Sequence, residues 1–271
     1  MIGIIIGVVL IGVAVGLWFY RKNQMDKALN IRYQETTTTK FIWENYESIS
    51  VAVGNGNYTE IVELKGVARC QQPLQAEHSK MPVVYYRASV IREYEVEEQE
   101  TDSNGNTRWV TKRRSDTIST NEQSVPFYVD DNSGKPIRVD MQGADKITQK
   151  TMDRFEREFS QSYLNEQSWG SQFSSYHSSS NYNSSNTLGY RLVEEAIPVN
   201  AQLYIYGEAS DRNGELSVIK PKDKNQNFIV SVKSEEQLVE SAQSSAKWSL
   251  IGMIASAVGG VAAIVWGIVA G

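Results

Sequence analysis

Two long apolar segments lie at the ends of the chain. Between them lie short runs of β-branched and aromatic residues, separated by polar turns, which are typical of strands. Residues 1–20 carry no charged side chain, and residues 248–271 carry none either. About 20 apolar residues cross the hydrocarbon core of a bilayer as a helix, the state that satisfies every backbone hydrogen bond in lipid. Both segments are therefore predicted to be transmembrane helices. A buried core helix is the alternative for the second segment.

The first segment differs from a cleaved signal peptide. No basic residue precedes its apolar run, and no polar, small-residue cleavage site follows it. Trp18, Phe19 and Tyr20 suit an anchor at the membrane interface. We therefore expect an uncleaved helix and a membrane hairpin, with both termini on one side.

Basic residues flank the two predicted spans on the side of the intervening domain. Arg21 and Lys22 directly follow the first span, and Lys247 directly precedes the second. The positive-inside rule then predicts a cytoplasmic domain, with the termini on the opposite side. No ionisable residue lies within either span, which argues against a proton or ion pathway.

Small residues recur at four-residue spacing within both spans. They are Gly3 and Gly7, Gly12 and Gly16, Gly252, Ser256 and Gly260, and Ala263, Gly267 and Gly271. This spacing lets helix backbones approach closely. It predicts packing of the two spans on each other or a homo-oligomer, and it does not distinguish the two.

Between the spans, the pattern predicts an α+β domain that is rich in strands. Residues 21–60 read as a juxtamembrane helical segment, residues 61–233 as the β-rich domain, and residues 234–247 as a helix leading into the membrane. Ser234 and Gln237 form a capping box at the start of that helix. Strands are expected at Ile61–Ala68, Val83–Val96, Thr107–Arg114, Val125–Val129, Pro136–Met141, Tyr190–Ile197, Gln202–Gly207, Leu216–Ile219 and Phe228–Val232.

Two turns punctuate the strands. Asn104-Gly105 predicts a hairpin whose glutamates and basic residues pair across the strands or remain solvated, and we favour the solvated alternative. The run Asp130–Gly134 suggests calcium at first sight, but it lacks the downstream bidentate glutamate of an EF-type loop. A simple turn is the better interpretation.

A helix and a loop are predicted between the two groups of strands. Met152, Phe155, Phe159 and Tyr163 follow helical spacing, which predicts an amphipathic helix over about 145–165. Residues 168–187 are rich in Ser and Asn and are expected to form a flexible loop. Three aromatic residues of this loop and one residue of the hairpin at Asn104-Gly105 are candidate partner contacts: Trp169, Phe173, Tyr176 and Trp109. The alternative is a disordered loop whose aromatic residues are incidental.

Composition excludes several kinds of chemistry. The chain has one Cys and two His, fewer than the four ligands of a structural zinc site, and one Cys cannot form an intrachain disulfide. Cys70 lies at a strand end without a His beside it in sequence, so a nucleophilic role is disfavoured. Glu194 and Glu195 are neighbours on a predicted strand and point to opposite faces. The net charge of -5 disfavours nucleic acid. We expect no catalytic residue, cofactor or metal.

Four sequence blocks carry a resemblance to a known family. They contain Gly66, Pro82, Tyr85, Tyr86, Pro126, Phe127, Gly134 and Gly207. In order and spacing they resemble the GIDE domain, also called BAM for "beside a membrane", of the mitochondrial E3 ubiquitin ligase family. The resemblance covers the region between the two spans and the spans themselves. It implies a domain held next to the bilayer.

The sequence also departs from that family. The family places a RING finger after the second span, whereas this sequence ends at Gly271, and Val83 stands where relatives often have Cys. We therefore expect a RING-less, prokaryotic form. The expected function is a membrane-anchored protein-interaction or scaffold module that contacts membrane lipids and an unidentified protein. The alternatives are an E3 ligase-like component with a separate RING partner, and a membrane hydrolase that uses Cys70 or a serine.

Overall fold

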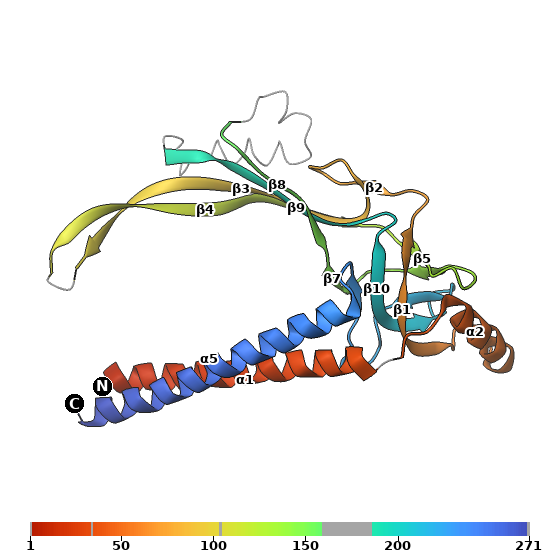
Figure 1. The fold of residues 1–271 in the computed structure, drawn as a ribbon, viewed down its shortest axis with the longest axis horizontal. Coiled ribbons are helices and arrows are strands. Elements are labelled where there is room, and N and C mark those ends of the chain that lie inside the picture. The colour runs from red at the N-terminus through yellow and green to blue at the C-terminus, as the bar shows by residue number, and fades with distance from the viewer. Residues whose placement is uncertain (1, 34, 103–104, 159–185, 270–271) are drawn as a thin grey trace. The chain divides into compact units, whose positions relative to one another are not determined.

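A computed structural model describes residues 2–33, 35–102, 105–158 and 186–269 of the chain (Figure 1). The chain divides into two compact units, and each is considered by itself. The first contains residues 1–65, 143–145 and 203–271, and the second contains residues 66–142 and 146–202. The fold class is α+β, as expected, with a long apolar helix near each end of a β-rich chain.

The first unit contains the helices α1 (Ile2–Tyr33), α2 (Thr39–Val53) and α5 (Glu235–Val269). The helices α1 and α5 are both long and apolar enough to cross a membrane. They lie side by side and antiparallel (Figure 1), which agrees with a two-span hairpin. The chain is therefore membrane-associated.

Local signals define where the helices begin and end. The predicted capping box forms at α5, where the Gln237 N–H donates to Ser234 Oγ at 3.4 Å and the Ser234 N–H donates to Gln237 Oε1 at 3.2 Å. Thr38 caps α2 by accepting the Phe41 N–H at 3.2 Å. Gly54 ends α2 with a φ of 81°, a conformation that favours glycine.

The strand β10 (Gln202–Ser210) organises the sheet of the first unit. It pairs antiparallel with β11 (Ser217–Ile219) and with β12 (Ile229–Ser231). Every residue of β11 and β12 is buried. Gly207 lies in β10 beneath Phe228, and a Cβ atom at this position would lie 2.8 Å from that ring. The close packing of this core thus requires glycine.

The second unit is built on an antiparallel sheet of five strands. Its order is β2-β3-β9-β8, and β4 pairs with the edge of β3 opposite β9. The strands are β2 (Leu74–Gln75), β3 (Pro82–Thr101), β4 (Thr107–Ser124), β8 (Gln149–Glu156) and β9 (Thr187–Pro198). One face of this sheet buries Val90, Tyr190 and Leu192. Nearby, Ala76 covers Tyr86, Ala88 and Ala196.

A small hairpin adds to the second unit. The strand β5 (Phe127–Asp130) pairs with β6 (Ile137–Val139) and with residues 67–69 of β1 (Thr59–Arg69). The expected turn over Asp130–Gly134 is confirmed, because the Asp130 carboxylate accepts the Asn132 N–H at 3.0 Å. Asn132, rather than Gly134, takes the left-handed conformation, with a φ of 60°.

The predicted amphipathic helix over 145–165 is wrong where the structure describes it. Residues 145–147 form the short strand β7 (Asp145–Ile147), and β8 follows. Met152 packs half-buried against the Val90 face of the sheet, whereas Phe155 lies on the opposite face and is 43 % exposed. Alternation between two faces is the period of a strand, and pairing with β9 overrides the helical spacing. Phe159 and Tyr163 lie outside the described residues.

A long two-stranded hairpin extends from the sheet (Figure 1). β3 and β4 stay paired from Tyr85↔Ser124 to Thr101↔Thr107, with one irregularity near Val90. Gly105 closes the predicted turn with a φ of 85°. The cross-strand ion pairs form, as between Lys112 Nζ and Glu100 Oε1 at 2.8 Å. The pairing alternative, which the sequence analysis disfavoured, is therefore the one that the structure shows. Because these side chains are partly exposed, we expect each pair to add little stability.

Candidate partner-binding site

The positions that carry the family resemblance lie at close backbone contacts, at buried aromatic positions and in the connections between strands. Gly66 lies against β5, where a Cβ atom would approach the Asp130 carbonyl oxygen to 2.9 Å. Pro82 begins β3, a position that tolerates the missing N–H. The remaining positions divide between buried aromatic side chains (Tyr85, Tyr86, Phe127), connections (Pro126, Gly134) and the close approach already described at Gly207.

A buried carboxylate organises one end of the second unit. Glu194, with an exposed fraction of 0 %, accepts the His78 N–H at 2.6 Å and the Ser79 hydroxyl at 2.5 Å. Thr151 donates its hydroxyl to the same carboxylate at 2.8 Å. These bonds fasten the turn after β2 to the strands β8 and β9. Glu195 points to the opposite, exposed face, as its place on a strand predicts.

Burial and hydrogen bonds act in opposite directions on this carboxylate. Burial has the largest effect and raises the pKa of Glu194, but the bonds from Ser79, His78 and Thr151 together outweigh it and hold the pKa below its ordinary value. Burial is also the largest influence on His78, and it lowers the pKa of that imidazole. The arrangement accounts for a fixed turn, because the buried carboxylate holds the residues after β2 against β8 and β9.

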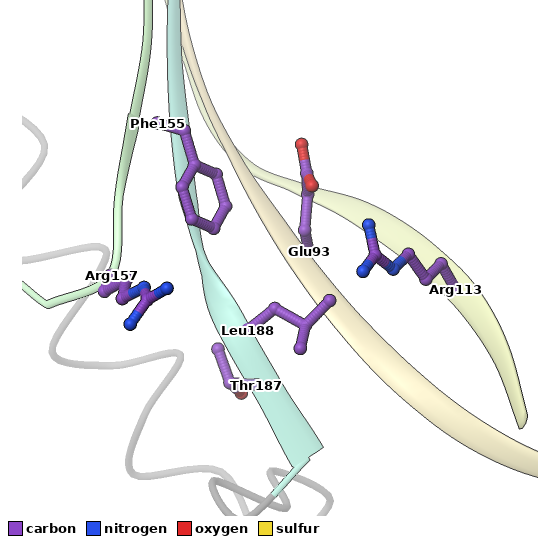
Figure 2. A pocket seen from close by; sticks show the side chains of 6 residues that line it. All are labelled: Glu93, Arg113, Phe155, Arg157, Thr187 and Leu188. Carbon is purple, nitrogen blue, oxygen red and sulfur yellow. The ribbon is translucent and has the colours of Figure 1, made fainter.

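An open cavity of about 530 Å³ lies further along the same unit, where β8 ends and β9 begins. Figure 2 shows its lining: Phe155 and Leu188 lie between Arg157 on one side and Glu93 with Arg113 on the other. Thr187 completes the wall. The strands β3, β4, β8 and β9 each supply at least one of these side chains, so the sheet itself fixes the cavity.

The charges around this cavity are unevenly paired. Glu93 Oε1 lies 3.6 Å from Arg191 Nη1, and Arg113 Nε lies 3.6 Å from Glu95 Oε1. Arg157 is exposed and makes no ion pair with any residue that the structure describes. An apolar floor beside an uncompensated cation suits an apolar side chain that has an acidic neighbour. Sequence reasoning missed this cavity because it expected Phe155 on a helix.

A second groove, of about 580 Å³, contains the chain's one cysteine. Arg69, Tyr128, Lys135 and Asn200 line it together with Cys70. The Cys70 Sγ lies 4.0 Å from the Pro126 carbonyl oxygen, and Arg69 Nε lies 3.8 Å from the Asp130 carboxylate. Among the described residues, no histidine lines this groove.

The candidate partner contacts have different outcomes. Trp109 lies on β4 near the tip of the long hairpin and is 69 % exposed, so it is available to a partner. Trp169, Phe173 and Tyr176 lie outside the described residues, as does His177. Among residues 2–33, 35–102, 105–158 and 186–269, no three His, Cys, Asp or Glu side chains cluster closely enough to hold a metal ion.

The first unit has a buried polar cluster of its own. Glu63 accepts the Tyr204 hydroxyl at 2.9 Å and the Thr36 hydroxyl at 2.5 Å. Lys65 Nζ lies 3.4 Å from the same carboxylate and 2.7 Å from Glu235 Oε2. The cluster thus links the segment after α1, the strands β1 and β10, and the start of α5.

Comparison with known proteins gives one match. A family model described as "GIDE: E3 Ubiquitin ligase" matches residues 95–265, which is more than half of the chain. The matched region includes the outer part of the long hairpin, all the residues that line the cavity of Figure 2 except Glu93, and most of α5. Neither the curated proteins nor the solved structures contain a match.

Proposed function

Because the chain belongs to the GIDE family of E3 ubiquitin ligases, we propose that it is a membrane-anchored module that binds a protein partner and organises it at the bilayer. In this proposal these 271 residues act as a scaffold. The 271 residues contain one Cys and two His, too few for the eight zinc ligands of a RING finger. The family name alone does not establish an activity, so the proposal depends on the surfaces of the domain.

The cavity of Figure 2 is the observation that supports this function best. It presents the half-exposed Phe155 ring beside Arg157, which has no acidic partner among the described residues. Aromatic and arginine side chains in a concave site are the groups that most often dominate protein–protein affinity. We infer that the partner inserts an apolar side chain next to a carboxylate.

Two paired variants test this function. The tagged full chain is crosslinked in its native membrane, and co-purifying proteins are quantified by mass spectrometry. Phe155→Ser and Arg157→Glu should each reduce recovery of the same protein about tenfold, the loss expected of a hot-spot residue. Arg154→Glu is the matched control, because Arg154 is also exposed on β8 but pairs with Glu156 at 2.8 Å, away from the cavity. Equal recovery with all three variants would contradict the proposal.

The family match favours a second candidate function. The chain is then an E3 ligase-like component that supports ubiquitin transfer through a separate RING protein. Its test is a reconstituted conjugation reaction with ubiquitin, a conjugating enzyme and the RING protein, in vesicles with and without the full chain. No increase in conjugates when the chain is added would exclude this function.

Orientation and self-association through the spans are also proposals. The basic residues Arg21, Lys22 and Lys247 support a cytoplasmic domain. A reporter that works only in the cytoplasm should be silent at Met1, and activity there would reverse the assignment. For self-association, Gly12 and Gly16 have open space around them, so this face of α1 is available to a second copy.

A further inference from the structure

We propose that the tip of the long hairpin joins copies of this chain edge to edge, with β3 of one copy pairing to β4 of the next. The tip, here called the arm, comprises residues 95–101 of β3 and residues 107–114 of β4. It lies within the second unit, and its two strands run side by side as a ribbon (Figure 1). The association needs no other protein, although Arg113 belongs both to the arm and to the cavity of Figure 2.

Both long edges of the arm lack a neighbouring strand among the described residues. β9 pairs with β3 as far as Tyr94↔Thr187, so within the described chain residues 95–101 of β3 pair with β4 alone. β4 itself pairs only with β3 within the described chain. Each edge therefore presents backbone N–H and C=O groups that a further strand can bind. A two-stranded ribbon is also marginally stable by itself, so an added strand would stabilise it.

The two edges have opposite charge. The β3 edge carries only acidic charges (Glu95, Glu97, Glu98, Glu100), and the β4 edge carries only basic ones (Arg108, Lys112, Arg113, Arg114). Within one copy these rows face each other, as in the pairs between Lys112 and Glu98 and between Arg113 and Glu95. Charged edge strands usually prevent sheet extension. Here, repulsion opposes contact between two β3 edges or two β4 edges, and attraction favours β3 with β4.

Glu97 is an acidic residue of the β3 edge that remains available for an ion pair with a second copy. It is exposed, lies opposite Thr111, and makes no ion pair with any residue that the structure describes. A β4 strand of a second copy beside β3 would bring basic side chains within reach of it. Trp109 pairs with Gln99 and therefore shares a face with Glu97, so the same contact would cover part of this exposed ring.

The geometry of the arm permits such a sheet to continue. β3 and β4 are antiparallel, so copies related by simple translation form an antiparallel sheet throughout. When the copies are related by translation, a contact between unlike edges does not close into a ring, because each added copy leaves one acidic and one basic edge free. The expected assembly is therefore a row of copies rather than a symmetric dimer.

Site-specific crosslinking of the purified full chain in detergent tests this proposal. Cys70→Ser removes the one native thiol, and single thiols are then added as Gln99→Cys on β3 or Thr111→Cys on β4. Both positions are exposed and lie outside the charged rows. A short bifunctional thiol reagent should join a mixture of the two variants several-fold more than either variant alone. Equal yields in all three samples, or no crosslinked product, would overturn the proposal.

Charge variants separate edge pairing from chance collision. Glu97→Lys should reduce mixed crosslinking several-fold, whereas Glu195→Lys, on the same sheet away from the arm, should not. Reversing all eight charges of the arm keeps the pairs within each copy and should restore crosslinking among reversed chains. Yields should also fall between 0.1 and 1 M salt, as the screening length shortens from about 10 to about 3 Å. Unchanged yields with Glu97→Lys and in high salt would contradict the proposal, and Arg157→Glu should leave the yield unaltered.

Discussion

A Cβ atom on Gly7 would lie 2.6 Å from the carbonyl oxygen of Gly260, and one on Gly260 would lie 3.0 Å from the carbonyl oxygen of Gly7. The backbones of α1 and α5 thus meet at these two glycines. Gly3 and Gly267 repeat the close approach one turn further along. The four-residue spacing of Gly3 and Gly7 therefore serves packing between the two spans of one chain.

Gly7→Leu should separate the two spans, because a side chain at this position collides with the backbone of α5. We expect a loss of about 1–3 kcal/mol, the range for overpacking a tight contact. Unfolding of the detergent-solubilised chain by dodecyl sulfate measures it. Gly12→Leu is the control, since nothing lies within 4 Å of a Cβ at Gly12. Equal effects of the two changes would mean that the helices do not pack through Gly7.

Glu194→Ala should destabilise the second unit, because it removes the acceptor of the buried His78 N–H and of the partly buried Ser79 N–H. A buried donor that loses its acceptor costs about 1–3 kcal/mol. Urea unfolding of the full chain in mild detergent measures the change. The control is Glu195→Ala, an exposed neighbour that should cost less than about 0.5 kcal/mol. A mild effect at Glu194 would show that other bonds hold the turn.

The free energy of unfolding should fall in two stages as the pH decreases. The pKa of His78 is lowered in the folded chain, so below its ordinary value of about 6.5 the unfolded chain takes up the proton first and stability declines. The pKa of Glu194 is also lowered, so its contribution is present above its ordinary value of about 4.3 and is lost as the pH falls further.

Urea unfolding between pH 4 and 8 measures this profile. Glu194→Gln should flatten the lower stage and leave the decline that begins near neutral pH. A free energy of unfolding that rises as the pH falls from 7 would contradict the assignment of both groups.

Tyr204→Phe should weaken the polar cluster of the first unit. The Tyr204 hydroxyl donates to the buried Glu63 carboxylate, and burial together with the nearby Glu63 charge raises its pKa, so it stays protonated and able to donate. Loss of this bond should cost about 1–3 kcal/mol in thermal or urea unfolding. Tyr46→Phe is the control, because the Tyr46 hydroxyl makes no hydrogen bond with any described residue. Similar costs at both positions would argue against a special role for the cluster.

Short-range patterns predicted much of the fold. The paired strands on either side of Gly105, the turn at Asn132 and the capping box at Ser234 all form, because each depends on residues close together in sequence. The helix over 145–165 fails for the same reason. Met152 and Phe155 match helical spacing locally, but the decisive partner of β8 is β9, about 40 residues further along.

The clusters that fix the domain could not be predicted in this way. Glu194 and His78 are 116 positions apart, and nothing in the sequence near either residue indicates that they meet. The sequence identified only that Glu194 and Glu195 face opposite ways, which is correct. The cavity beside Phe155 likewise needs residues from four strands, so it emerges only once the sheet is assembled.

The presence of a long apolar helix at each end of the domain also affects its proteolytic release from the membrane. Proteases cut most readily at exposed loop tips, and the loops of the domain lie between the two helices in the sequence. A single cut there yields two fragments, and each keeps a helix that is long and apolar enough to cross the bilayer. Neither fragment is shed by that cut. Release of a soluble piece requires two cuts, so the domain resists shedding in a way that a protein with one anchor does not.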